Sequence, residues 1–146
     1  MSDIELRPVV PANREAWAEL WRAYLAFYGT ELDAAAYDAA FAQLTSDDPG
    51  TFRGLIAWSG GAARGLVHWV WHPHMWRPAG AVYLQDLFVA PQARGMGVGR
   101  RLIEAVYADA DARGAPSVYW LTQAGNPARA LYDRVATRTD FVKYAR

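Results

Sequence analysis

The stretch Gln92-Ala-Arg-Gly-Met-Gly-Val-Gly-Arg-Arg101 decides the fold of this chain. It lies between an apolar run and an amphipathic run, so it predicts a strand, a glycine-rich turn and a helix. Gly95, Gly97 and Gly99 carry no Cβ atom that would keep a ligand away from the backbone. Backbone N–H groups and peptide dipoles converge at a helix N-terminus, and three arginines lie in this stretch. The stretch therefore predicts a site for a pyrophosphate.

The spacing of the loop excludes two common phosphate-binding motifs. A dinucleotide fingerprint needs G-x-G-x-x-G, and a Walker loop needs Gly-Lys-Ser/Thr, whereas the only lysine of this chain is Lys143. The loop instead resembles the Gln/Arg-x-x-Gly-x-Gly/Ala signature of the GNAT acetyltransferases. Gln92, Gly95 and Gly97 occupy the signature positions.

Motifs on both sides of the loop extend this resemblance over residues 82–146. Tyr83-Leu-Gln-Asp-Leu-Phe-Val-Ala-Pro91 precedes the loop, and Ser117-Val-Tyr-Trp-Leu-Thr122, Asn126 and Leu131-Tyr132 follow it. These segments resemble the branch of the spermidine/spermine and histone/polyamine-type acetyltransferases. The resemblance implies an α/β GNAT fold with a central mixed, mostly antiparallel sheet of six to seven strands flanked by four helices. Two parallel strands are expected to splay around the coenzyme site.

Length and composition indicate a single domain over residues 1–146 with a buried core. Apolar residues make up 53% of the chain, but no apolar run approaches the ~20 residues of a membrane span, and the N-terminus lacks a secretory pattern. The absence of cysteine excludes disulfides and thiolate zinc sites. Fifteen basic and fifteen acidic residues balance. We therefore expect a cytoplasmic protein with no metal, nucleic-acid or membrane partner.

The periodicity of the apolar residues predicts the element order β-αα-βββ-α-β-α-β. Strands are expected over residues 4–10, 52–58, 64–72, 81–90, 117–122 and 139–144. Helices are expected from Asn13 to Gly29, from Asp33 to Leu44, from Val98 to Gly114 and from Asn126 to Val135. Ser59-Gly-Gly-Ala62 predicts a hairpin turn, and the segment from Pro73 to Gly80 predicts a loop.

In the GNAT family, the loop and the strand before it hold the pyrophosphate and the pantetheine arm of acetyl-coenzyme A. The resemblance thus implies acetyl-CoA as the cosubstrate. The residues that it assigns to cofactor binding are Leu87, Phe88, Val89, Gln92, Arg94, Gly95, Met96, Gly97, Val98, Gly99, Arg100 and Asn126. The usual motif is Asn-x-x-Ala-x-x-Leu-Tyr, but Asn126 precedes Ala128 by only two positions, so its register is shifted.

Acetyl transfer to an amine needs an acid for the departing thiolate and a base for the ammonium. Tyr132 stands where many family members use a tyrosine as the acid; the alternative is that it only packs against the coenzyme. The polyamine branch carries a Glu-Asp pair on the strand before the loop, where this chain has Gln85-Asp86. We expect Asp86 to be the base if a β-bulge re-aims it; the alternative is that Asp86 is a buried structural acid. His68, His72 and ordered water are the alternatives.

Tyr28, Gln85 and His68 are expected at the acceptor pocket. Aromatic side chains should pack mostly in the core, with one or two facing an ammonium substrate: Trp69, Trp71, Trp76, Tyr83 and Trp120. The resemblance implies an N-acetyltransferase for a primary amine, most simply a small molecule such as a polyamine or an amino-acid-like compound. It also implies a homodimer. A protein lysine or N-terminus as acceptor, or a non-catalytic acyl-CoA-binding regulatory module, are the alternatives.

Overall fold

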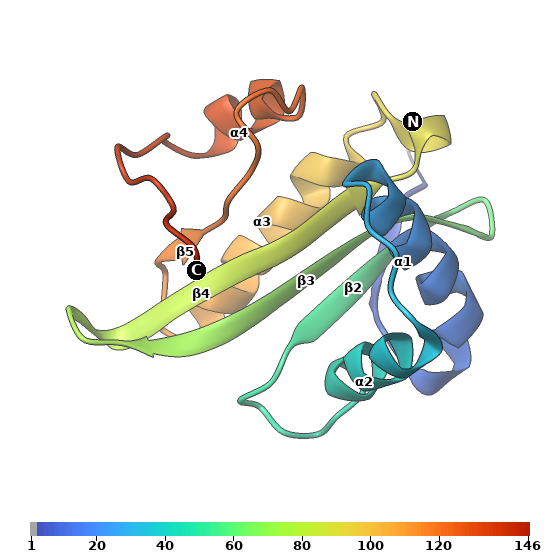
Figure 1. Ribbon diagram of the computed structural model, residues 1–146, viewed down its shortest axis with the longest axis horizontal. Coiled ribbons are helices and arrows are strands. Elements are labelled where there is room, and N and C mark those ends of the chain that lie inside the picture. The colour runs from blue at the N-terminus through green and yellow to red at the C-terminus, as the bar shows by residue number, and fades with distance from the viewer. Residues whose placement is uncertain (1–2) are drawn as a thin grey trace.

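In the computed structural model, which describes residues 3–146, five strands form one sheet in the order β1-β2-β3-β4-β5 (Figure 1). The strands are β1 (Glu5–Pro8), β2 (Arg53–Ser59), β3 (Ala62–His74), β4 (Arg77–Val89) and β5 (Val118–Tyr119). The helices are α1 (Arg14–Phe27), α2 (Ala34–Leu44), α3 (Val98–Ala112) and α4 (Arg129–Val135), with short 3-10 helices η1 (Pro11–Asn13) and η2 (Pro91–Ala93). Neighbouring strands are antiparallel, except that β4 and β5 run parallel. The mixed sheet confirms the expected α/β class.

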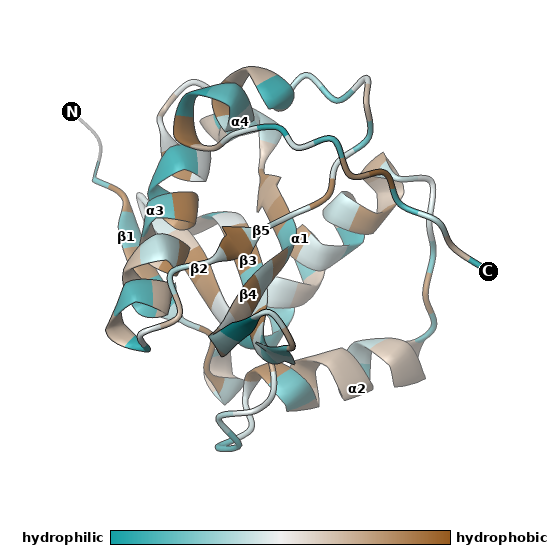
Figure 2. Cartoon of the chain, turned by 90° about the vertical axis from the view of Figure 1, so that its left-hand side faces the viewer, coloured by the Kyte–Doolittle hydropathy of each residue, from teal (hydrophilic) through white to brown (hydrophobic). Residues whose placement is uncertain are grey.

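The helices form two layers on the sheet. α1 and α2 cover one face and α3 covers the other (Figure 1), and each layer encloses its own apolar cluster. Val67 and Leu102 belong to the cluster beneath α3, whereas Trp17, Leu66 and Phe88 belong to the cluster beneath α1 and α2. Because successive strand residues point to opposite faces, the neighbours Leu66 and Val67 serve different clusters. Figure 2 shows hydrophobic residues concentrated along the strands between these layers.

Several local predictions are confirmed. The apolar residues at helical spacing on α1 that become buried are Trp17, Leu20, Trp21 and Leu25. Asp33 begins α2 by accepting a hydrogen bond from the Ala36 N–H at 2.9 Å. Gly60 and Gly61 join β2 to β3 with φ of 59° and 76°, the conformation of a tight hairpin turn. These elements depend on short-range sequence patterns, which is why they can be predicted.

The β3–β4 hairpin is longer than expected. The strand ladder continues to the His74–Arg77 pair, so the loop predicted in this region was wrong. Pro73 favours a loop because proline has no N–H to donate, but the ladder shifts register beside it and requires no hydrogen bond at that position. Met75 and Trp76 form the tip, where they are 99% and 82% exposed.

The sheet has five strands rather than six to seven. β5 spans two residues instead of 117–122, and the closing strand predicted over 139–144 does not form. The alternation Phe141-Val-Lys-Tyr144 has strand propensity, but a strand forms only where a neighbouring edge offers hydrogen-bond partners. The three apolar side chains of this segment stay exposed instead: Phe141, Val142 and Tyr144.

Candidate active site

The glycine-rich turn between β4 and α3 has the conformation that the sequence predicts. Gly95 and Gly97 have φ of 82° and 80°, which L side chains rarely adopt, and a Cβ on either would meet nothing within 4 Å. Gly97 immediately precedes α3 and provides no side-chain cap, so the first N–H groups of the helix lack intrahelical partners. Arg94 and Arg100 are exposed, whereas Arg101 donates to a backbone carbonyl near β1. The turn therefore offers N–H donors and positive charge to an anion.

Two of the residues assigned to the coenzyme face the protein interior. Val98 and Gly99 are buried, while Gln92 and Met96 are exposed. A Cβ on Gly99 would lie 3.1 Å from Cδ2 of Leu131. The third glycine of the turn therefore allows α3 to pack against α4.

The edge of β4 next to β5 is largely unpaired. The two strands pair only at Val82–Val118 and Tyr83–Tyr119, although β4 continues to Val89. The residues predicted to contact the pantetheine arm lie on this unpaired stretch: Leu87, Phe88 and Val89. A linear molecule that carries amide groups can therefore bind along the edge as an additional strand would.

A β-bulge at Gln85 sets the direction of Asp86. The ladder pairs Asp86 with His68 and Leu84 with Trp69, which leaves Gln85 as the extra residue of β4. Leu84 packs beneath α3, whereas Asp86 is buried on the α1 face beside His68. In a regular strand, Leu84 and Asp86 would share one face. The β-bulge on which the predicted role of Asp86 depends is thus present, and Gln85 itself is exposed.

Asp86 is the end of a buried hydrogen-bond chain. His68 Nδ1 lies 3.0 Å from Asp86 Oδ2, and Trp17 Nε1–H donates to His68 Nε2 at 3.0 Å. Because the indole nitrogen can only donate, Nε2 must accept, and the ring hydrogen of the neutral imidazole lies on Nδ1. His68 therefore donates to the Asp86 carboxylate. The exposed fractions of Trp17, His68 and Asp86 are 0%, 4% and 6%.

Tyr24 and Tyr83 lie near enough to the Asp86 carboxylate for its charge to act on them. Burial, and next the Asp86 carboxylate beside it, raises the pKa of Tyr24. Burial, followed by Asp86 and Tyr119, raises the pKa of Tyr83. Burial raises the pKa of Tyr132 to about 12, with a smaller effect of Tyr28. Both Tyr28 and Tyr132 also contribute to the shift of Tyr24, so the predicted acid and the predicted base belong to one group of side chains.

His72, an alternative base, has both ring nitrogens engaged elsewhere. Its Nδ1–H donates to the carbonyl of Pro73 at 2.7 Å, and Nε2 lies 2.9 Å from the hydroxyl of Tyr119. Because Nδ1 carries the hydrogen, Nε2 accepts from that hydroxyl. His72 therefore supports the β3–β5 side of the sheet.

Asn126 uses its side chain within its own turn. Nδ2 donates to Oγ1 of Thr122 at 3.0 Å, and Oδ1 accepts from the N–H of Ala128 at 2.9 Å. These bonds shape the start of α4, which carries Tyr132, despite the shifted register of the motif. The Asn126 side chain therefore positions α4.

The sequence does not identify Trp17 and Tyr24 as site residues. Their spacing of seven places both on the expected core stripe of α1, and that pattern by itself indicates packing. Of the aromatics expected near an acceptor, Tyr83 lies beside Asp86, whereas Trp69 and Trp71 pack beneath α3. Polar contacts between distant segments are what distinguish Trp17 from its apolar neighbours.

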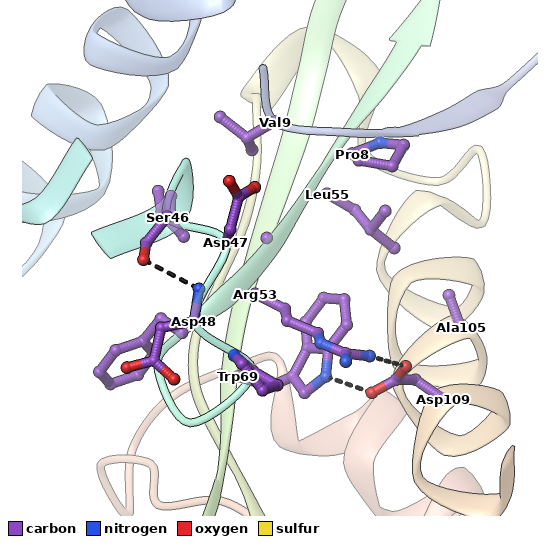
Figure 3. A pocket seen from close by; sticks show the side chains of 14 residues that line it. Pro8, Val9, Ser46, Asp47, Asp48, Arg53, Leu55, Trp69, Ala105 and Asp109 are labelled. Carbon is purple, nitrogen blue, oxygen red and sulfur yellow. Dashed lines mark hydrogen bonds and ion pairs between the residues drawn. The ribbon is translucent and has the colours of Figure 1, made fainter. Parts of the chain in front are cut away.

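A separate cavity of about 480 Å³ lies between the α2–β2 connection and α3 (Figure 3). Asp109 lies in one wall of the cavity, where it forms an ion pair with Arg53 and accepts a hydrogen bond from Trp69 Nε1–H at 2.8 Å. No residue predicted for the coenzyme or for acid–base chemistry lines this cavity. The cavity is thus distinct from the candidate active site.

Within residues 3–146, no three His, Cys, Asp or Glu side chains are grouped so as to hold a metal ion. The helices in that same part of the chain are too short or too polar to span a bilayer.

Comparison with known proteins places this geometry in context. Residues 14–136 match the model of the Acetyltransferase (GNAT) family. The chain is 38% identical to the D-amino-acid N-acetyltransferase HPA3 of Saccharomyces cerevisiae, over 98% of this chain and 90% of the relative.

Solved structures share the same fold. The aminoglycoside acetyltransferase AAC(6')-Iy, in complex with the bisubstrate analog CoA-S-monomethyl-acetylneamine, aligns with a TM-score of 0.84 and 21% identity, over 99% of this chain and 98% of that one. A ribosomal-protein-alanine N-acetyltransferase from Brucella melitensis aligns with a TM-score of 0.79 and 18% identity, over 97% and 96% of the two chains. At these identities the similarity is one of fold.

Proposed function

The chain belongs to the GNAT family of acetyltransferases, and from that premise we propose that it acetylates the amino group of a small amino-acid-like molecule with acetyl-CoA. The observation that carries the proposal is the bulge at Gln85. It turns Asp86 to the α1 face beside Tyr24, whose ring contacts Tyr28, and Tyr132 of α4 approaches these two tyrosines from the α3 side of the sheet. The proposal thereby combines a carboxylate for the amine with a hydroxyl for the thiolate.

Asp86 is the proposed general base. Its carboxylate attracts the substrate ammonium and accepts one of its protons, which leaves a neutral amine able to attack the acetyl carbonyl. His68 is less suited to this role because its two ring nitrogens already bind Trp17 and Asp86. Asp86 also supplies a carboxylate in place of the glutamate that the polyamine branch has at the position of Gln85. The substitution at Gln85 is therefore no longer a reason to interpret the chain as a non-catalytic module.

Tyr132 is the proposed general acid. A pKa of about 12 keeps the hydroxyl protonated at the pH of an ordinary assay, so it has a proton to give to the departing thiolate. Tyr132 is held in place from α4, which α3 supports through the hydrogen bond from the Tyr107 hydroxyl to the Val135 carbonyl at 2.8 Å. The acid is thus carried on a supported helix rather than on a loop.

The donor is proposed to lie along the turn and the open edge of β4. The N–H groups from Gly97 to Arg100 face the pyrophosphate in this arrangement, with Arg94 adding charge, whereas the Met96 N–H donates to the Ala93 carbonyl. The main chain of Leu87–Val89 pairs with β3 on one side, and its edge towards β5 has no strand partner, so it offers hydrogen-bond partners to the amides of the pantetheine arm. The residues present therefore fit acetyl-CoA.

The proposed acceptor class follows the 38%-identical relative, whose name specifies D-amino acids. One buried carboxylate with tyrosine rings beside it suits a compact ammonium with a short apolar group. Polyamines, the acceptors of the branch that the sequence resembles, carry several ammonium groups and need further anionic contacts. Protein lysines or N-termini need an open groove beside Asp86. Both remain alternatives that an acceptor panel separates.

The test is acetyl-CoA-dependent thiol release with D- and L-amino acids, spermidine, an aminoglycoside and a lysine peptide. The proposal predicts turnover with an amino acid and its loss in Asp86→Asn. Release with spermidine or the peptide alone would move the acceptor to another class. No release with any amine, or full activity of Asp86→Asn, would refute the proposed chemistry.

We also propose that the protein is a homodimer in which the exposed C-terminal segment pairs with a second copy. Phe141 and Tyr144 are 85% and 93% exposed in a segment with strand propensity, which suits an edge supplied by another chain. Light scattering with size exclusion is the test. A monomeric wild-type protein, or a dimer that persists unchanged in a Phe141→Ser, Tyr144→Ser double variant, contradicts the arrangement.

A further inference from the structure

We infer that Trp17 and His68 are positioning residues for acetyl transfer: the Trp17 indole N–H fixes the tautomer of His68, and His68 in turn holds the Asp86 carboxylate in its reactive orientation. The inference rests on the proposed role of Asp86 as the base. Trp17 itself is fully buried on α1 and is separated from the carboxylate by the imidazole ring.

The tautomer follows from the two partners of the imidazole. A neutral imidazole has one N–H and one lone pair. Trp17 Nε1–H donates to Nε2 at 3.0 Å and so reserves that nitrogen as the acceptor. The remaining N–H lies on Nδ1, 3.0 Å from Asp86 Oδ2, and donates a hydrogen bond to this carboxylate oxygen. With the opposite tautomer, a lone pair would face the carboxylate and repel it.

The surroundings hold the imidazole in this orientation. The Trp21 ring lies 5.1 Å from the His68 ring between centroids and stacks on Trp17 at 6.0 Å. The ring of His68 cannot rotate without displacing these indoles, because the exposed fractions of all three side chains are below 10%. One oxygen of Asp86 is therefore anchored, and the carboxylate keeps one orientation toward the acceptor.

Trp21 provides a matched control for Trp17. It lies one helical turn further along α1 and is similarly buried, but its Nε1 is a buried polar atom without a hydrogen-bond partner among the described residues. Phenylalanine in place of either indole removes a similar volume and keeps an aromatic ring against His68, so the packing that holds the imidazole is retained in both variants. Only Trp17→Phe also removes the donor to His68.

The experiment combines kinetics with ¹⁵N NMR of the imidazole in Trp17→Phe, Trp21→Phe and His68→Asn. The wild-type spectrum should show the Nδ1–H tautomer of His68, and Trp17→Phe should shift the Nε2 signal, because this nitrogen loses its hydrogen-bond donor. We expect Trp17→Phe to lower kcat about tenfold with little change in the KM for acetyl-CoA, and Trp21→Phe to stay within about twofold. Asparagine offers an N–H near the position of Nδ1, so His68→Asn should keep more activity than His68→Ala.

A double variant tests the order of the chain. Once asparagine supplies the donor to Asp86, the tautomer no longer matters, so adding Trp17→Phe to His68→Asn should cost little further activity. Equal losses in Trp17→Phe and Trp21→Phe would overturn the inference, as would an Nε2–H tautomer in the wild type. Failure of the proposed function is a different result, because it appears as an inactive wild type or an active Asp86→Asn.

Discussion

Tyr132→Phe links the proposed acid to a measurable property of the fold. Burial is the main cause that raises the pKa of Tyr132 from 10.0 to about 12. The folded protein therefore retains this proton at a pH where the unfolded chain has lost it. The resulting stabilisation is fully present below pH 10 and is lost as the pH rises towards 12, because the unfolded state ionises first.

The size of the effect follows from the two pKa values. At pH 11 the unfolded tyrosine is about 90% ionised and the folded one about 10%, which lowers the free energy of unfolding by about 1.4 kcal/mol relative to pH 8. Phenylalanine cannot ionise, so Tyr132→Phe should lose about 1.4 kcal/mol less stability than the wild type over this range. Tyr24 and the other titrating groups are common to both proteins and largely cancel in the difference, since Tyr132 is the smallest cause of the Tyr24 shift.

Urea unfolding followed by tryptophan fluorescence at pH 8 and pH 11 measures this difference. Tyr144→Phe, which removes a hydroxyl from a side chain that is 93% exposed, is the control and should follow the wild type. Turnover at pH 8 should fall about 100-fold in Tyr132→Phe, because general acids contribute about 10²–10⁴-fold. Equal losses of stability in wild type and Tyr132→Phe would refute the burial argument, and unchanged turnover would refute the acid role.

Four further variants, one of them a control, test the base, the turn and the distant cavity separately. Asp86→Asn should lower kcat at least about 100-fold with an unchanged KM for acetyl-CoA in the thiol-release assay, and a proportional rise in KM would contradict its role. Gly97→Ala and Gly114→Ala should each lose about 1 kcal/mol in urea unfolding, since both glycines have positive φ. Calorimetry should show weaker acetyl-CoA binding only for Gly97→Ala. Equal binding by both variants would contradict the proposed contact between the turn and the coenzyme. Asp109→Asn weakens the contact with Trp69 and should lower stability by about 1 kcal/mol without changing kcat; a change in kcat would couple the cavity to the active site.

The elements that the sequence predicts well are those that depend on residues close together in the chain. The turn at Gly95 and Gly97, the stripe of α1 and the hairpin at Gly60 each depend on neighbours a few positions apart. Strand lengths were predicted less well. The ladder extends past Pro73 and stops early at β5, because pairing depends on the edge that another segment offers.

The candidate site divides in the same way. Tyr132 and Asp86 could be named from motifs, but the direction of Asp86 depends on one extra residue, Gln85, which no local pattern marks as a bulge. Trp17 lies 51 positions before His68, and its place on an apolar stripe indicated only packing.

The sequence by itself determined the family, the glycine-rich turn before α3 and the two faces of the main helices, because these follow from covalent spacing and periodicity. Only the tertiary structure decided that Trp17, His68 and Asp86 form one buried chain. A hydrogen bond requires two groups within about 3 Å in space, and folding can bring such groups together from any distance along the chain.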